Sequence, residues 1–173
     1  MGNSDAFLLD PHASKEEPTE RHLVQRDWTL ARLSAEHLDY LRSFEPTVEL
    51  DVDGFRLLCF HGSPGDYDEV VLPEDPPGPF AGADLLAGGH VHVPQLRRVG
   101  SGWYVNPGSV GIGYDHLQPD DDFRFDPWAS YAIVEARSVE FHRVPFDLDE
   151  LDRVTREAAM PMAGEVFDRY RRS

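Results

Sequence analysis

The chain has 173 residues, a formal net charge of −16 and a hydrophobic fraction of 40%, and it contains one cysteine, Cys59. This length and composition predict a single folded domain over residues 1–173. The strong negative charge, with no cluster of Lys and Arg, argues against binding to a nucleic-acid duplex. The sequence has no run of 18 apolar residues and no basic-then-apolar leader, so we expect neither a membrane partner nor secretion. Because a lone cysteine excludes an internal disulfide, these features together predict a cytoplasmic protein.

Periodicity and turn residues predict a chain of mixed helices and strands, as in an α/β protein. In chain order we expect a polar turn at residues 1–5, helices at 22–33 and 35–44, a hairpin of strands 47–52 and 55–60, a strand at 84–87, a second hairpin of 95–99 and 103–105, a strand pair at 130–136 and 139–144, and helices at 147–159 and 164–171. Ser34 and Asp147 are the expected N-caps, and Asp53-Gly54 is the expected hairpin turn. The acidic residues 66–83, rich in Pro and Gly, read as a long surface loop at the rim of a site.

Two histidines follow the short buried strand at residues 84–87. His90 and His92 come after two glycines, and in an extended segment residues i and i+2 point to the same side, so both imidazoles would face one point. This arrangement suits a divalent transition metal, although two solvent-facing loop histidines would give the same pattern. His61 follows the strand 55–60 in the same way, at the sheet edge where α/β proteins place their chemistry.

Asn3, in a glycine-containing turn near the start of the chain, offers an amide oxygen to the same set. Three imidazoles and an amide oxygen suit Mn, Fe, Zn or Ni better than Mg or Ca, which prefer shells of oxygen ligands. A metal site of this kind lowers the pKa of a bound water and draws charge from a phosphoryl oxygen. We therefore expect Asn3, His61, His90 and His92 to act as metal ligands.

Four short motifs occur along the chain, and they are Gly2-Asn3-Ser4-Asp5, His61-Gly62, Gly89-His90-Val91-His92-Val93-Pro94 and Asn106-Pro107-Gly108-Ser109. In order and spacing they resemble the motifs of the calcineurin-like metallophosphoesterase family, in its small single-domain prokaryotic branch. The resemblance covers about residues 2–145. It implies an α/β fold (α+β in some schemes) in which two β-sheets pack as a sandwich flanked by helices. It also implies two divalent metals about 3.5–4 Å apart, one bound by Asn3, His61 and His90 and the other by His92.

Two departures from the family pattern change what we expect of this chain. The family usually opens with an Asp-x-His strand and a Gly-Asp turn, which supply three metal ligands, and this chain begins at the third motif. We therefore expect a shortened enzyme that lacks two N-terminal strands, keeps at most one weakly bound metal and exposes sheet edges through which a homo-oligomer would form. Ser4 stands where many members have a histidine that protonates the leaving group, and a hydroxyl cannot replace it near neutral pH. Asp5, which would orient a neighbour, is then the candidate catalytic residue.

The sequence therefore predicts a metal-dependent phosphoesterase that hydrolyses phosphate mono- or diesters with a metal-activated water, with little activity in the shortened chain. Its substrate would be a phosphate-ester small molecule or a nucleotide. The alternative is a non-catalytic remnant of the same fold that binds a metal or a partner. A cupin-like barrel, which also uses His-x-His, is a poorer match, because Gln95-Leu96-Arg97-Arg98 follows the pair in place of an acidic ligand.

Overall fold

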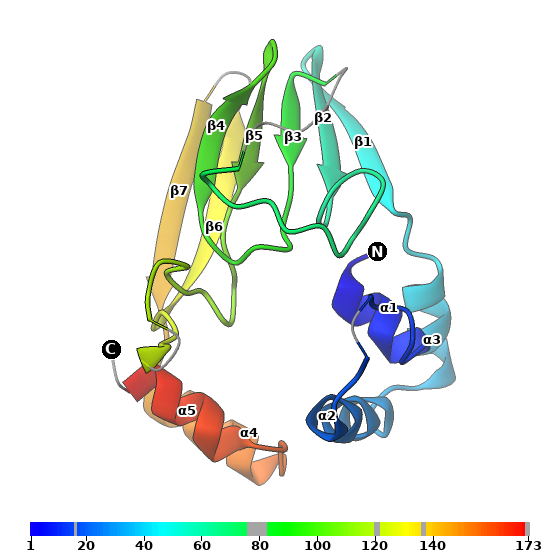
Figure 1. The fold of residues 1–173 in the computed structure, drawn as a ribbon, viewed down its shortest axis with the longest axis vertical. Helices are drawn as coiled ribbons and strands as arrows, with labels where there is room; N and C mark the ends of the chain where they lie inside the picture. Colours follow the sequence, from blue (N-terminus) through cyan, green and yellow to red (C-terminus); the bar gives the residue numbers. More distant parts are fainter. Residues whose placement is uncertain (16, 76–82, 120–121, 136–137, 172–173) are drawn as a thin grey trace.

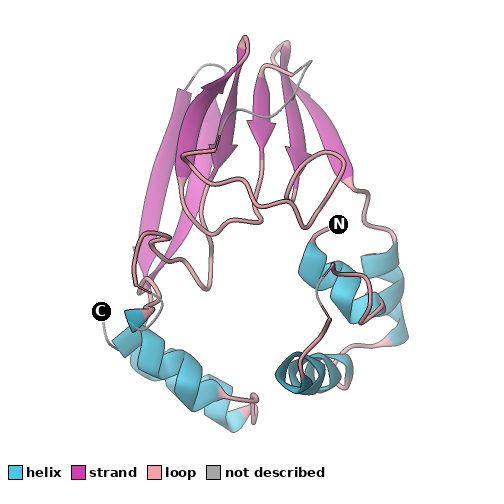
Figure 2. Ribbon diagram, viewed as in Figure 1, coloured by secondary structure: helices cyan, strands magenta, loops and turns pink. Residues whose placement is uncertain are grey.

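A computed structural model describes residues 1–15, 17–75, 83–119, 122–135 and 138–171 of the chain. Two β-sheets stand next to each other, and the helices lie at the end toward which β2, β3 and β5 run (Figure 1, Figure 2). The elements are α1 (Asn3–Leu9), α2 (Glu20–Leu30), α3 (Ala35–Arg42), β1 (Thr47–Val52), β2 (Phe55–Phe60), β3 (Leu85–Ala87), β4 (Gln95–Val99), β5 (Gly102–Asn106), β6 (Trp128–Glu135), β7 (Ser138–Pro145), α4 (Leu148–Glu157) and α5 (Ala163–Arg171). The mixed α/β fold expected from the sequence is therefore confirmed, as a five-stranded and a two-stranded sheet flanked by helices.

The helix termini follow the local capping chemistry. The expected polar turn at residues 1–5 is wrong, because α1 begins at Asn3 and Asp5 accepts a hydrogen bond from the Gly2 N–H at 2.9 Å. Helix α2 begins two residues earlier than the periodicity indicated, since Thr19 accepts from the His22 N–H at 3.3 Å. Ser34 caps α3 as predicted, with its hydroxyl 3.2 Å from the His37 nitrogen.

The five-stranded sheet has the order β1-β2-β3-β5-β4. Strands β1 and β2 form the predicted hairpin, in which Val52 pairs with Phe55 across Asp53-Gly54. Strands β2, β3 and β5 run parallel to one another. Their carboxyl ends therefore meet at a single edge of the sheet, and the residues that follow each strand are brought together there.

Strand β3 is buried on both faces, as its continuous apolar run predicted. Leu85 and Leu86 are each 1% exposed. Leu86 belongs to the core cluster that includes Val71 and Tyr104, so the segment after β2 covers that face. Leu85 lines a cavity of about 550 Å³ between the two sheets, together with side chains of β6 and β7 such as Val134.

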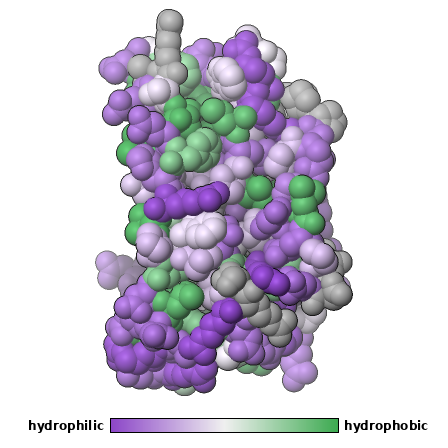
Figure 3. Space-filling model, turned by 90° about the vertical axis from the view of Figure 1, so that its left-hand side faces the viewer, coloured by the Kyte–Doolittle hydropathy of each residue, from purple (hydrophilic) through white to green (hydrophobic). Residues whose placement is uncertain are grey.

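The second sheet is the antiparallel pair of β6 and β7, in which Ala129 pairs with Val144 and Tyr131 with His142. Several of its apolar side chains are exposed, including Tyr131, Ile133 and Val144. Hydrophobic patches interrupt the hydrophilic surface on the side of the molecule that carries β7 (Figure 3). Association between copies through exposed strands stays a prediction. The sequence placed Ala136 in this pair, but that residue lies outside the described ranges.

The two C-terminal helices differ in how deeply they pack. No residue of α4 is buried, whereas α5 buries Phe167 and Tyr170, which are 1% and 3% exposed. Asp147 caps α4 as predicted, since it accepts from the Glu150 N–H at 3.0 Å. Among the described residues, no helix combines the length and the apolar character that a bilayer crossing would need.

Replacing Gly88 by alanine tests the close packing at the end of β3. An added Cβ would lie 2.9 Å from Cε2 of Tyr104 and closer still to its hydroxyl, and Tyr104 is 1% exposed. We expect Gly88→Ala to lower the free energy of unfolding by about 1–3 kcal/mol, measured by urea denaturation. Gly65→Ala is the matched control, because nothing lies within 4 Å of its Cβ position and the change should have little effect. Equal stabilities of the two variants would contradict this packing argument.

Candidate metal centre

The start of helix α1 carries Asn3 to the carboxyl edge of the five-stranded sheet. Gly2 is buried, and a Cβ built on it would lie 3.1 Å from Nδ1 of His61 and 3.2 Å from Oδ2 of Asp5. A side chain at this position would therefore press against both groups. The hydrogen bond from the Gly2 N–H to Asp5 fixes the turn. Asp5 thus acts on the position of the residues between it and Gly2, which include Asn3.

His61 follows β2 and contacts two other segments at once. Its Nε2 lies 2.9 Å from Oδ1 of Asn3. Its carbonyl accepts hydrogen bonds from the N–H groups of Gly89 at 2.8 Å and His90 at 3.0 Å. Because an amide oxygen only accepts, His61 carries a proton on Nε2 in this arrangement. If that proton were lost, His61 Nε2 and Asn3 Oδ1 could both bind the same cation.

His90 completes a three-residue group. The rings of His61 and His90 meet edge to face, with centroids 5.2 Å apart. The segment from Gly88 to Pro94 is not a regular strand, and bends occur at His90 and Val91. The alternation of an extended segment therefore does not decide where His90 and His92 point.

His92 lies beside this group and is held by a different loop. Its Nδ1 is 2.9 Å from the carbonyl oxygen of Ile112, so Nδ1 carries the proton and Nε2 keeps its lone pair. Its ring also meets Tyr114 edge to face, with centroids 6.0 Å apart. His92 contributes to the electrostatic field at His61 and at His90, which shows that the three rings share one region.

Asn106, at the end of β5, supports the backbone between these two histidines. Its side chain is completely buried, and Nδ2 donates to the carbonyl of Val91 at 2.5 Å. Its Oδ1 accepts from the Gly108 N–H at 2.9 Å. Both hydrogen-bonding ends of the amide are thus engaged, so Asn106 fixes the backbone at Val91 and Gly108.

The C-terminal helix α5 holds the loop that contacts His92. The Tyr170 hydroxyl donates to the carbonyl of Gly111, the residue before Ile112. Ser109 accepts from the N–H of both Gly111 and Ile112, at 3.3 and 3.2 Å. The orientation of His92 therefore depends on a helix almost 80 residues away in the sequence, a link that no local motif indicated.

Burial and like charge lower the pKa of two of the histidines. Burial is the largest cause of the lowered pKa of His61, and the charge of His90 adds to it, while Asp5 acts in the opposite direction. Burial also lowers the pKa of His90 most, and here the charge of Asp68 opposes the shift. Asp68, in the acidic loop after β2, was missed as a neighbour of the site, because only the fold brings it near His90.

The donor atoms fit one cation better than two. Asn3, His61 and His90 offer an amide oxygen and two imidazoles, which is a set that borderline transition metals accept. Within the described part of the chain, no three side chains drawn from His, Cys, Asp and Glu come close enough to hold a metal. His92 belongs to no such group among the described residues, so Asn3, His61 and His90 remain the candidate donors for one cation.

The lowered pKa values of His61 and His90 predict how stability depends on pH. The unfolded chain, with imidazoles near their ordinary pKa of 6.5, binds protons more readily than the folded chain. The free energy of unfolding of the metal-free protein should therefore fall as the pH drops below about 6.5. Urea denaturation between about pH 7.5 and 5 measures the slope for the wild type and for a His61→Gln, His90→Gln double variant. The slope should be smaller in the variant, and equal slopes would contradict the assignment.

Comparison with solved structures supports the fold. A hypothetical protein of Pyrococcus horikoshii OT3 matches with a TM-score of 0.77 and 22% identity, covering 96% of this chain and 69% of that one. A metallophosphoesterase from Sphaerobacter thermophilus matches with a TM-score of 0.69 and 29% identity, covering 97% of this chain and 73% of that one.

Sequence comparison identifies the family. An uncharacterized protein of Methanocaldococcus jannaschii is 26% identical over 140 residues, which are 70% of this chain and 54% of that protein. This chain therefore spans about half the length of that curated relative. The family model described as calcineurin-like phosphoesterase superfamily domain matches residues 1–138. The chain belongs to the calcineurin-like phosphoesterase superfamily.

Proposed function

We propose that this chain is a metal-dependent phosphoesterase that hydrolyses phosphate mono- or diesters at the Asn3, His61 and His90 group. The observation that carries the proposal is the contact of 2.9 Å between Asn3 Oδ1 and His61 Nε2, with the His90 ring 5.2 Å from His61. These side chains come from three separate segments and meet at one sheet edge. Because the chain belongs to a phosphoesterase superfamily, we interpret this group of side chains as a site for phosphoester hydrolysis.

Asn3, His61 and His90 would hold a divalent transition metal of the Mn, Fe, Zn or Ni class. A metal bound there lowers the pKa of a coordinated water and draws charge from a phosphoryl oxygen. The lowered pKa values of His61 and His90 keep both imidazoles neutral near pH 7, so their nitrogen lone pairs are available. The positions of the three side chains are set before any ligand arrives, because backbone hydrogen bonds to the His61 carbonyl and the Gly2–Asp5 turn fix them.

Asp5 and His92 have supporting roles in this proposal. Asp5 is a positioning residue, since its carboxylate holds the Gly2 N–H and acts on the charge of His61. His92 presents Nε2 toward the same region while Ile112 holds its other nitrogen. We propose that His92 contacts a phosphate oxygen or a further metal that reaches the site with other ligands.

One observation favours the alternative of a metal-binding chain with little hydrolysis. Ser4 offers a hydroxyl beside Asn3, and a hydroxyl does not donate protons readily near neutral pH. In addition, no three side chains from His, Cys, Asp and Glu form a metal site among the described residues, and both features favour slow hydrolysis. Measuring metal content and hydrolysis on the same samples separates the two functions.

Removing one ligand at a time tests the proposal. His61→Ala and His90→Ala should each weaken Mn²⁺ or Zn²⁺ binding by at least about 100-fold, because a lost ligand costs more than a lost second-layer contact. Hydrolysis of bis(p-nitrophenyl) phosphate should fall with metal content, while His92→Ala should retain one metal. His12→Ala is the matched control, since the His12 side chain is 71% exposed and is not one of the proposed ligands.

Calorimetric titration and metal analysis provide the readout for binding, and release of p-nitrophenol provides the readout for hydrolysis. Metal binding without hydrolysis in the wild type would favour the non-catalytic alternative. Full metal binding in both His61→Ala and His90→Ala would contradict the proposed centre.

A further inference from the structure

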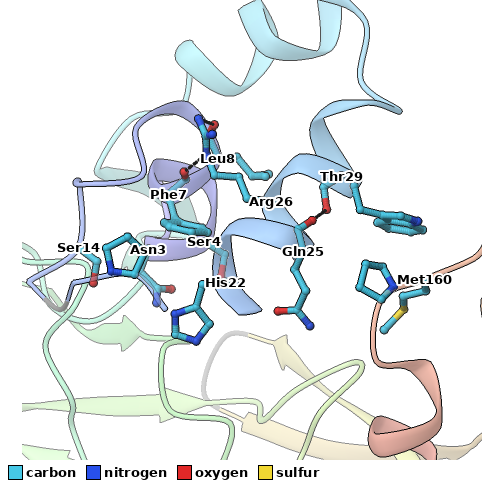
Figure 4. Close-up of a pocket in the computed structure, with 13 residues that line it drawn as sticks. Asn3, Ser4, Phe7, Leu8, Ser14, His22, Gln25, Arg26, Thr29 and Met160 are labelled. Carbon is cyan, nitrogen blue, oxygen red and sulfur yellow. Dashed lines mark hydrogen bonds between the residues drawn. The ribbon is translucent and has the colours of Figure 1, made fainter. Parts of the chain in front are cut away.

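A cavity of about 570 Å³ opens next to the proposed metal centre (Figure 4). Four segments form its wall, and they are α1, the loop after α1 with Ser14 and Pro18, α2, and the turn at Met160-Pro161 between α4 and α5. Asn3 and Ser4 belong to this wall, so the cavity and the metal centre share a border. A cavity of this size is in the range that holds a small organic ligand.

The walls of the cavity are held in place by hydrogen bonds between the segments. Arg26 of α2 donates from Nε to the carbonyl of Phe7 and from Nη2 to the carbonyl of Leu8, both at 2.9 Å. Trp28 donates from its indole nitrogen to the carbonyl of Ala158 at 3.1 Å. The guanidinium of Arg32 lies 3.9 Å from the Trp28 ring centre, which covers one side of that ring. The cavity is therefore preformed by contacts between elements.

The charge of the cavity differs from that of the rest of the chain. Asp and Glu make up 32 of the 173 residues, yet none of the 13 residues that line the cavity is acidic. Arg26 brings a positive charge to its wall, and its side chain is only 17% exposed. A phosphate ester would therefore meet no fixed negative charge in the wall, in a protein whose net charge is −16.

The chemistry of the wall suits an uncharged aromatic group. Phe7, His22 and Trp28 provide ring surfaces, and Met160 and Pro161 add apolar surface. Gln25 and Thr29, on the same side of α2, provide polar groups in the cavity wall. The Nδ1 of His22 is 3.4 Å from the Thr19 nitrogen and accepts from it, which leaves Nε2 as the protonated nitrogen and a hydrogen-bond donor.

We propose that this cavity binds the aromatic leaving group of a phosphate ester whose phosphate lies at the Asn3, His61 and His90 group. The inference rests on the proposed function, because it takes the phosphate to be bound beside Asn3. It adds the substrate class, an ester of an aromatic alcohol or of a nucleoside. It also assigns to His22 a hydrogen bond to the bound ester.

Direct binding to the full chain tests the cavity without relying on hydrolysis. In the presence of Mn²⁺, calorimetry compares 1-naphthyl phosphate with methyl phosphate, which carries the same phosphate and no ring. The naphthyl ester should bind at least about tenfold more tightly, because burial of its ring removes apolar surface from water. Gln25→Trp fills the cavity and should weaken 1-naphthyl phosphate about tenfold while methyl phosphate is unaffected. Thr29→Phe serves the same purpose if Gln25→Trp does not fold.

Val24→Trp is the matched control, since it places the same side chain on α2 at a residue that is 47% exposed and does not line the cavity. Circular dichroism melting of each variant confirms folding. Adenosine 5′-monophosphate distinguishes the two ester types. If it binds to the wild type and not to Gln25→Trp, the substrate is a nucleoside ester. If it does not bind to the wild type, the substrate is an ester of a simple aryl alcohol. Equal binding of naphthyl and methyl phosphate by the wild type would overturn the proposal.

The result for the cavity stands apart from the result for the proposed function. Ring-dependent binding that is lost in Gln25→Trp supports the cavity even if no wild-type sample hydrolyses either ester. Hydrolysis that depends on His90 but is the same for 1-naphthyl and methyl phosphate, and the same in Gln25→Trp, supports the metal centre and contradicts the cavity. His22→Ala should weaken the naphthyl ester less than Gln25→Trp does, because it removes one hydrogen bond and leaves the cavity open.

Discussion

The proposed site depends on one residue, His61, which contacts the segment after β3 and the start of α1 from its own position after β2. Its carbonyl accepts the N–H groups of Gly89 and His90, while its ring meets Asn3 on one side and Gly2 on another. Backbone and side chain of a single residue thus fix the distance between the ends of β2, β3 and the N-terminal turn. Hydrogen bonds of this kind contribute only about 1 kcal/mol each to stability, but together they set the positions of Asn3, His61 and His90 relative to one another.

This junction requires the parallel core of the sheet behind it. Because β2 and β3 run parallel, with Leu58 opposite Leu86 and Cys59 opposite Ala87, the residues after both strands emerge at the same edge. Gly88 lies against Tyr104 at the point where the chain leaves β3, and only glycine fits there. The packing of Leu86 and Tyr104 therefore affects the site, because any shift of β3 would move His90 relative to His61.

Much of this arrangement follows from local patterns. Alternation and Asp53-Gly54 predicted the first hairpin, and the buried strands followed by histidine and glycine indicated His61 and His90. Other features depend on contacts that no local pattern contains. Helix α1 begins at Asn3 because Asp5 holds the Gly2 N–H, and His92 is oriented by Ile112, 20 residues further on, whose loop is held by Tyr170.

The charge of the donor set links the metal centre to the acidic surface. Asn3, His61 and His90 are neutral ligands, so a divalent cation held by them would keep nearly all of its charge for an anionic substrate. In bridged two-metal sites, carboxylate ligands neutralise part of that charge. Here two acidic residues of the loop after β2, Asp66 and Asp68, are engaged by Lys15, through its side chain and its backbone N–H respectively. An acidic protein attracts a phosphate ester most readily where its own carboxylates are absent or engaged. Asp5, Asp66 and Asp68 accept hydrogen bonds from the chain, and no acidic residue lines the cavity beside Asn3.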